Sequence, residues 1–205
     1  MKQIKIFKQE TDKSCGVACL RSILNYYGND FSEKDIFDIK KNFNSEKWGL
    51  QNPQINLGNA ALRLGFNVTY IGENHIIAYN NQFKDIKKSL KEKLKTYSDY
   101  GKFVAEETLE FLKRGGKIKI ELLTIEKIKK ILNKYKFAIV EINPASIRKK
   151  GNNNLRHKII LTGYTKNGFE ILNPSDTKKY VYPFDDFIFA FYQAEAELLI
   201  IQNKK

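Results

Sequence analysis

The stretch KQETDKSCGVACL, residues 8–20, contains both cysteines of the chain and the start of its first apolar repeat. Gln9 lies six positions before Cys15. From Cys15 to Tyr27 the apolar residues recur at helical spacing, and Ser14 stands where an N-cap belongs. The stretch therefore predicts a helix that presents a cysteine at its N-terminus.

A cysteine in this place is predicted to be an activated nucleophile. The attacking species is the thiolate, which a helix N-terminus stabilises through its dipole and free N–H groups. Gly16 leaves room for a substrate carbonyl, and the N–H of Cys15 together with the Gln9 side-chain amide could hold the oxyanion. The alternative is a packed core thiol, the role we assign to Cys19 one helical turn later.

Such a thiol needs an imidazole, and the chain has only His75 and His157. His157 opens the predicted strand HKIILTGY (157–164), which a turn with Asn-Gly joins to FEIL (169–172). This hairpin places Asn173 roughly opposite His157, where an amide oxygen could orient the ring. Asn173 as a simple turn residue before Pro174 is the alternative.

Further helices are predicted mainly in the first half of the chain and strands mainly in the second. The predicted helices are 31–39, 54–64, 83–96, 103–112, 124–135 and 184–191, and the other predicted strands are 4–7, 66–71, 137–142 and 196–201. This order favours an α+β fold with a helical N-terminal lobe and an antiparallel C-terminal sheet. We expect a single domain over 1–205, with a Lys-rich helical insertion at about 73–121.

The composition limits the classes of function. The chain has 36 Lys+Arg against 23 Asp+Glu, a net charge of +13, but the lysines are spread over many segments and Arg is scarce. We therefore read the charge as compositional bias and expect no nucleic acid partner, although a Lys face on the insertion is an alternative. No apolar run approaches membrane-spanning length and no secretory signal is visible, so we expect a cytoplasmic protein without a membrane span.

Four segments together resemble one known family, the C39 and C39-like cysteine peptidases of the papain-like superfamily. They are Gln9, CGVACL (15–20), YYG (26–28) and HKIILTGYTKNGFEILNPSD (157–176). The resemblance implies a papain-like fold, Cys15 as nucleophile, His157 as general base and Gln9 as oxyanion donor. Asn173 stands where the family usually has the Asp of Asp-Pro, and Asp176 is the other candidate partner for His157.

The resemblance also implies an activity and its rivals. We expect a peptidase that cleaves amide bonds of a peptide or protein through a thioester on Cys15, and the reaction needs no metal or cofactor. Relatives fused to peptide exporters remove leader peptides, but no membrane segment or Gly-x-x-x-x-Gly-Lys loop is present, so we expect a free-standing enzyme. The alternatives are an acyltransferase of the same superfamily and a non-catalytic peptide-binding or regulatory module. The oligomeric state is not predicted.

Overall fold

The computed structural model describes residues 3–39, 53–72, 76–77, 85–148 and 156–204. The helices are α1 (Cys15–Tyr26), α2 (Glu33–Ile39), α4 (Gln54–Arg63), α6 (Ile86–Lys93), α7 (Asp99–Lys113), α8 (Ile125–Tyr135), α9 (Pro144–Arg148) and α10 (Phe184–Tyr192), with a 3-10 turn η1 (Leu94–Thr96) after α6. The strands are β1 (Asn67–Ile71), β2 (Lys117–Lys119), β3 (Ala138–Ile142), β4 (His157–Tyr164), β5 (Phe169–Asn173), β6 (Lys178–Tyr182) and β7 (Leu198–Gln202). The expected α+β class is confirmed.

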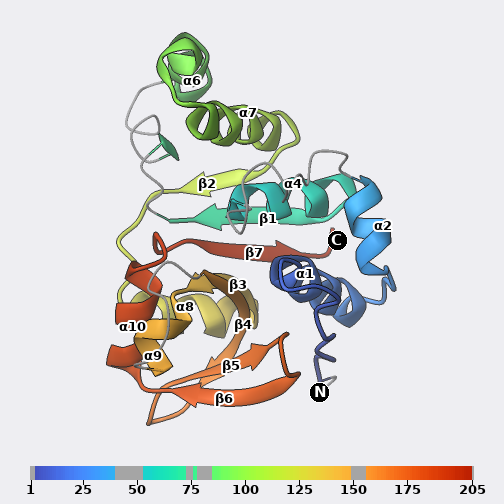
Figure 1. Cartoon of the computed structure of the whole chain (residues 1–205), viewed down its shortest axis with the longest axis vertical. Coiled ribbons are helices and arrows are strands. Elements are labelled where there is room, and N and C mark those ends of the chain that lie inside the picture. Colours follow the sequence, from blue (N-terminus) through green and yellow to red (C-terminus); the bar gives the residue numbers. More distant parts are fainter. Residues whose placement is uncertain (1–2, 40–52, 73–75, 78–84, 149–155, 205) are drawn as a thin grey trace.

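One sheet of seven strands runs through the molecule in the order β2-β1-β7-β3-β4-β5-β6 (Figure 1). Every neighbouring pair is antiparallel except β1 and β2, which are parallel. Strand β7, late in the sequence, lies between β1 and β3 and therefore joins the two halves of the sheet. The sequence predicts a sheet in the C-terminal half of the chain. The structure shows instead that β1, from the first half of the chain, and β2 belong to the same sheet.

Helices cover both faces of this sheet. Helices α1, α4 and α7 pack on one face in a core that includes Tyr70, Ile139, Ile160 and Leu199. Helices α8 and α10 pack on the other face, against residues such as Val140. Strands β3 and β7 are buried on both faces, which explains why they are nearly continuous apolar runs in the sequence.

Several local predictions differ from the structure. Residues 4–7 form no strand; this segment instead lies along α1, and the Phe7 N–H donates to the Ser22 hydroxyl at 3.0 Å. Strands β2 and β6 and helix α9 were not predicted, since their polar and lysine-rich sequences lack a strong apolar period. Residues 40–52 and the second histidine, His75, lie outside the described residues.

The Lys-rich segment contributes α6, η1, α7 and β2, and α7 is packed firmly on α4. The Asn59 side chain donates to the backbone carbonyl and the carboxylate of Glu107, at 2.8 and 2.7 Å. Phe111 is fully buried, and a β-carbon on Gly58 would lie 2.8 Å from its ring. Whether this segment is an insertion stays a prediction, but its described part belongs to the core and to the sheet.

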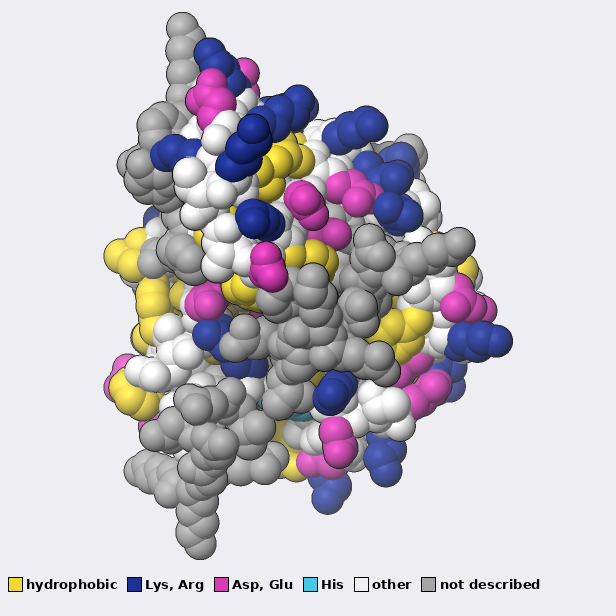
Figure 2. Space-filling model, turned by 45° about the horizontal axis from the view of Figure 1, so that its top comes forward, with side chains coloured by type: hydrophobic (Ala, Val, Ile, Leu, Met, Phe, Trp, Pro, Cys, Tyr) yellow, Lys and Arg dark blue, Asp and Glu magenta, His cyan; other side chains and the backbone are white. Residues whose placement is uncertain are grey.

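Basic side chains are numerous on the face shown in Figure 2, and acidic side chains lie among them. Over α6 and α7, Lys88 pairs with Glu92 at 3.9 Å and Lys102 with Asp99 at 3.9 Å. The basic residues on this face are therefore interrupted by carboxylates. Within the ranges that the structure describes, no helix is long and apolar enough to cross a membrane.

Candidate active site

Cys15 is the first residue of α1 and is partly exposed, whereas the rest of the first turn is buried. Ser14 occupies the N-cap position, as predicted, but its hydroxyl does not cap the helix. It accepts from the Thr11 N–H at 3.0 Å and donates to the Thr11 carbonyl at 3.1 Å. The N–H groups of the first turn, which have no acceptor within the helix, are therefore not capped by Ser14 and can stabilise an anion at Cys15.

His157 is the first residue of β4, and its Nε2 lies 2.7 Å from Asn173 Oδ1. The same oxygen accepts from the Ser175 N–H at 3.1 Å and from the Ser175 hydroxyl at 3.0 Å. Because a backbone N–H can only donate, the atom facing it must be the oxygen of the amide, so His157 Nε2 must carry the proton. The neutral ring then has its lone pair on Nδ1, the nitrogen left for a thiol.

The strand register behind this contact differs from the predicted one. In the β4–β5 hairpin, Ile160 pairs with Leu172 and Tyr164 with Phe169, with an irregularity between Leu161 and Gly163. This register places Asn173 diagonally across from His157 and not directly opposite it. The two side chains meet because both lie at the same end of the hairpin, and a side chain can span such a diagonal.

Asp176, the other candidate partner of His157, is used elsewhere. Its carboxylate accepts from the Tyr180 hydroxyl and, at 3.1 Å, from the Lys178 N–H. These bonds lower the pKa of Asp176, although its slight burial acts in the opposite direction. The structure therefore places Asn173, and not Asp176, on the histidine.

The surroundings of Cys15 favour its thiolate. Burial raises the pKa of the Cys15 thiol, but the hydrogen bond with His157, the charge of His157 and the charge of Lys158 together bring that pKa below its usual value. The Lys158 N–H also donates to Cys15 Sγ at 3.4 Å. By contrast, Cys19 is fully buried, and burial raises its pKa well above the usual value. The assignment of Cys19 to the core is confirmed.

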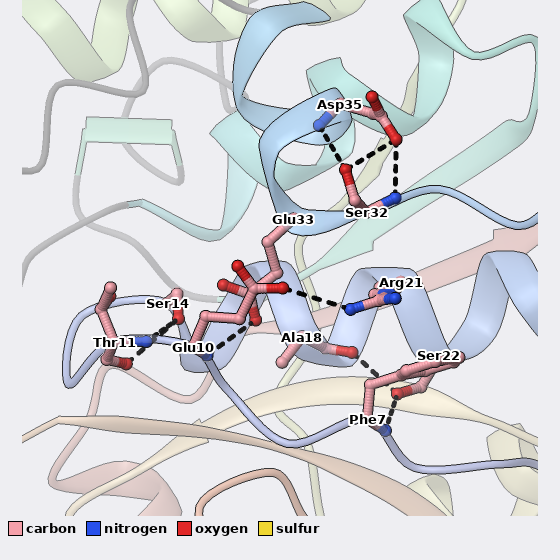
Figure 3. A network of polar contacts seen from close by, with 10 residues as sticks. All are labelled: Phe7, Glu10, Thr11, Ser14, Ala18, Arg21, Ser22, Ser32, Glu33 and Asp35. Carbon is pink, nitrogen blue, oxygen red and sulfur yellow. Dashed lines mark hydrogen bonds and ion pairs between the residues drawn. The ribbon is translucent and has the colours of Figure 1, made fainter.

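Gln9 lies in a loop, and both its backbone and its side chain are hydrogen-bonded. Its N–H donates to the Pro174 carbonyl at 2.9 Å, next to Asn173, and its Nε2 donates to the Thr11 carbonyl at 2.8 Å. That second bond fixes the orientation of the amide, because a carbonyl can only accept, and it uses one of the two N–H groups on Nε2. Figure 3 shows how the neighbouring Glu10 is held: its N–H donates to buried Glu33 at 3.2 Å.

Two charged residues at the site were missed in the sequence. Lys158 and Glu141 are buried opposite each other on β4 and β3, and Lys158 Nζ lies 2.8 Å from Glu141 Oε2. The side chain of Lys158 also fills the space beside Gly16, where a β-carbon would lie 2.7 Å from Lys158 Cδ. The expectation that Gly16 leaves room for substrate is therefore wrong, since the protein itself occupies that space.

The arrangement brings a thiol, an imidazole and an amide oxygen together at one place. Gln9 and Cys15 from the N-terminal segment lie with His157 and Asn173 from the β4–β5 hairpin in one region, where α1 packs on β4. No group of three or more His, Cys, Asp or Glu residues suited to a metal ion occurs among the residues that the structure describes.

The sequence of residues 1–197 matches the profile of a family described as the Peptidase_C39 like family. The chain belongs to this family. The comparison of this C39-like chain with curated proteins gave no match. Solved structures with a similar fold are less than 25% identical to the chain, so they bear on its fold alone.

Three similar structures illustrate the fold of this C39-like chain. The peptidase domain of Streptococcus ComA, a bifunctional ABC transporter involved in quorum sensing, has a TM-score of 0.54 at 16% identity and covers 98% of this chain and 100% of its own. A double glycine motif protease from an AMS/PCAT transporter, in complex with the leader peptide, has a TM-score of 0.52 at 14% identity and covers 98% and 93%. A C39-like protein from Bacillus anthracis has a TM-score of 0.52 at 12% identity and covers 100% of this chain and 99% of its own.

Proposed function

We propose that this protein is a cysteine peptidase that hydrolyses amide bonds through a thioester on Cys15. The observation that supports this most strongly is the double engagement of His157. Its Nε2 donates to an Asn173 oxygen that backbone hydrogen bonding orients, and, although burial raises the pKa of the Cys15 thiol, the His157 ring helps to bring that pKa below its usual value. A histidine used only for packing would need neither a fixed tautomer nor a thiol partner.

In the proposed reaction, His157 Nδ1 takes the proton of the Cys15 thiol. The sulfur attacks the substrate carbonyl carbon, a C–S bond forms, and the carbonyl π electrons move to the oxygen. The Cys15 N–H and the Gln9 amide N–H hold this oxyanion. His157 then returns the proton to the leaving nitrogen as the C–N bond breaks, which leaves an amine and a thioester.

Water completes the cycle. His157 takes a proton from the water molecule, the oxygen attacks the thioester carbon, and the C–S bond breaks. The proton on His157 then passes to the sulfur, which regenerates the Cys15 thiol and the neutral base and releases a carboxylic acid. The proposed substrate is a peptide or protein, in keeping with the family and with the leader peptide bound to the similar double glycine motif protease. That the chain acts without a transporter stays a prediction from its sequence.

Selective alkylation tests the proposal. We would react the protein with iodoacetamide between pH 5 and pH 9, locate the modified cysteine by mass spectrometry, and compare wild type with His157→Ala. Cys15 should react far faster than Cys19 at a pH well below the roughly 8.5 of a free thiol, because its thiolate is favoured. The His157→Ala protein should lose most of that advantage.

Peptide turnover completes the test. A peptide library incubated with the wild type should yield new termini, and Cys15→Ser should yield none. A Cys15 that reacts like any exposed thiol in both proteins would overturn the enzyme reading in favour of a peptide-binding module. Products that join the acyl group to an added amine instead of water would identify an acyltransferase.

A further inference from the structure

Lys158 is an unusual residue to find at the centre of a fold. It follows His157 directly, only 3% of it is exposed, and its ammonium is paired with Glu141, which is 4% exposed. A buried ion pair of this kind contributes little to stability, because the cost of removing two charges from water offsets their attraction. Its place beside Cys15 gives it a different role.

Lys158 contacts the first turns of α1 at three points. Its N–H donates to Cys15 Sγ at 3.4 Å, and its carbonyl accepts from the Cys19 thiol at 3.5 Å. Its aliphatic stem passes Gly16 so closely that a β-carbon there would lie 2.7 Å away. Lys158 thus contacts the start of α1 through its backbone and its stem, and the same residue carries the ammonium that is paired with Glu141.

Few charged groups in the described part of the chain surround the Lys158 ammonium, so its positive charge can favour the thiolate of Cys15. Besides Cys15 and Cys19, the titratable groups that face Lys158 are Glu141 and Glu197. Burial and the neighbouring carboxylates raise the pKa of Glu197 to about 8, so near pH 7 this group is mostly neutral. The buried set around Lys158 then holds one cation and one anion.

The groups behind Glu197 do not add a free charge to this set. The Tyr70 hydroxyl donates to Glu197 at 2.9 Å, and Glu195 pairs with Arg156 at 3.2 Å. The Tyr100 hydroxyl also faces these carboxylates, and burial raises its pKa further above the usual value, so it stays neutral. Among the residues that the structure describes, Glu141 is the carboxylate paired with the ammonium.

We propose that Lys158 is a positioning residue of the active site: its ammonium, held by Glu141, is a second positive charge that favours the Cys15 thiolate, and its backbone fixes the sulfur against β4. This rests on the proposed peptidase function. It predicts that part of the reactivity of Cys15 comes from Lys158 and persists independently of His157 as the proton acceptor.

The test compares two isosteric substitutions in the same buried cluster. Lys158→Met keeps the length of the stem and removes the charge, whereas Glu197→Gln removes a group that is already mostly neutral near pH 7. The readout is the rate of Cys15 alkylation by iodoacetamide against pH, with far-UV circular dichroism to confirm folding. A structural perturbation alone would affect both variants in the same direction.

Lys158→Met should move the midpoint of the profile upward by about one pH unit, which corresponds to about tenfold slower alkylation below the midpoint. Glu197→Gln should keep the wild-type profile below pH 8. A wild-type midpoint in Lys158→Met, or an equal shift in both variants, would overturn the inference. If Lys158→Met does not fold, the double variant Lys158→Met/Glu141→Gln replaces it, because this variant leaves no unpaired buried charge. The double variant should show the same upward shift of the midpoint. An unshifted midpoint in the double variant would also overturn the inference.

Failure of this inference and failure of the proposed function have different signatures. If wild-type Cys15 reacts like an ordinary thiol, the peptidase proposal fails and Lys158 has nothing to assist. If wild-type Cys15 is activated, loses activation in His157→Ala and keeps it in Lys158→Met, only the role of Lys158 is rejected.

Discussion

In the proposed mechanism, Asn173 acts on the site through one oxygen atom. That oxygen accepts three hydrogen bonds, one from His157 and two from Ser175, and it is buried. The bond from the Ser175 backbone fixes the amide, the amide fixes the tautomer of the ring, and the ring can then act as a base through Nδ1. A carboxylate in the same place would accept the same bonds.

We therefore expect Asn173→Asp to keep most of the activity and Asn173→Ala to lose it. Loss of a positioned base lowers kcat/KM by about 10²-fold or more, so Asn173→Ala should fall in that range on a peptide that the wild type cleaves. Asp176→Asn is the matched control, since Asp176 bonds Tyr180 and Lys178, and it should stay close to wild type. An equal loss of activity in Asp176→Asn and Asn173→Ala would contradict the assignment of the orienting role to Asn173.

The residues of the site differ in how far the sequence could predict them. Cys15 and His157 stand at the starts of a well-marked helix and strand, so local pattern was enough to select them. Lys158 and Glu141 could not be selected, because a lysine in a chain with 36 Lys+Arg looks solvated until strand pairing shows it buried opposite Glu141. The role given to Gly16 failed for the same reason, since Lys158 fills that space.

At the scale of elements, the site depends on how α1 sits on β4. The closest approach is at Gly16, where a β-carbon would lie 2.7 Å from Lys158 Cδ and 2.8 Å from Leu57 Cδ1. Both neighbours are buried, so neither can move away freely. The predicted hairpin, by contrast, was correct in its strands and wrong in its register, because an irregularity in β4 cannot be read from alternation.

Gly16→Ala should lower the free energy of unfolding by about 1–3 kcal/mol, the usual cost of overpacking a core. Gly163→Ala is the matched control on β4, because its β-carbon would meet only the carboxylate end of Glu170, at 3.0 Å. That control should change stability by less than about 0.5 kcal/mol. Urea unfolding followed by circular dichroism measures both, and equal stabilities would show that α1 can shift on the sheet.

At the scale of the whole molecule, the Lys-rich segment is tied to the main body by α7. Phe111 on α7 is fully buried and contacts the surface of α4 at Gly58, which in turn lies close to Leu199 of β7. Arg63 of α4 also donates to Glu110 at 3.0 Å. The sequence could predict helices here from their apolar stripe but not what they pack against, because the partners lie far away in the chain.

Phe111→Ala should therefore destabilise the entire protein by about 3–5 kcal/mol, the usual cost of removing a buried aromatic side chain, and unfolding should remain a single transition. Leu122→Ala, at a side chain that is 59% exposed, should change stability by less than about 0.5 kcal/mol. Differential scanning calorimetry checks this. Two separate transitions in Phe111→Ala would instead show that the segment folds as an autonomous unit.

The central place of β7 has a consequence for how the protein is made. Strands β1 and β2 on one side and β3 to β6 on the other are joined in the sheet through β7, whose residues 198–202 are synthesised after those of the other six strands. A nascent chain that ends before Leu198 carries Cys15 and His157 but lacks the strand on which both halves of the sheet pair. Such long-range pairing is slow to form, so we expect the reactive thiol to be activated only after synthesis has passed β7.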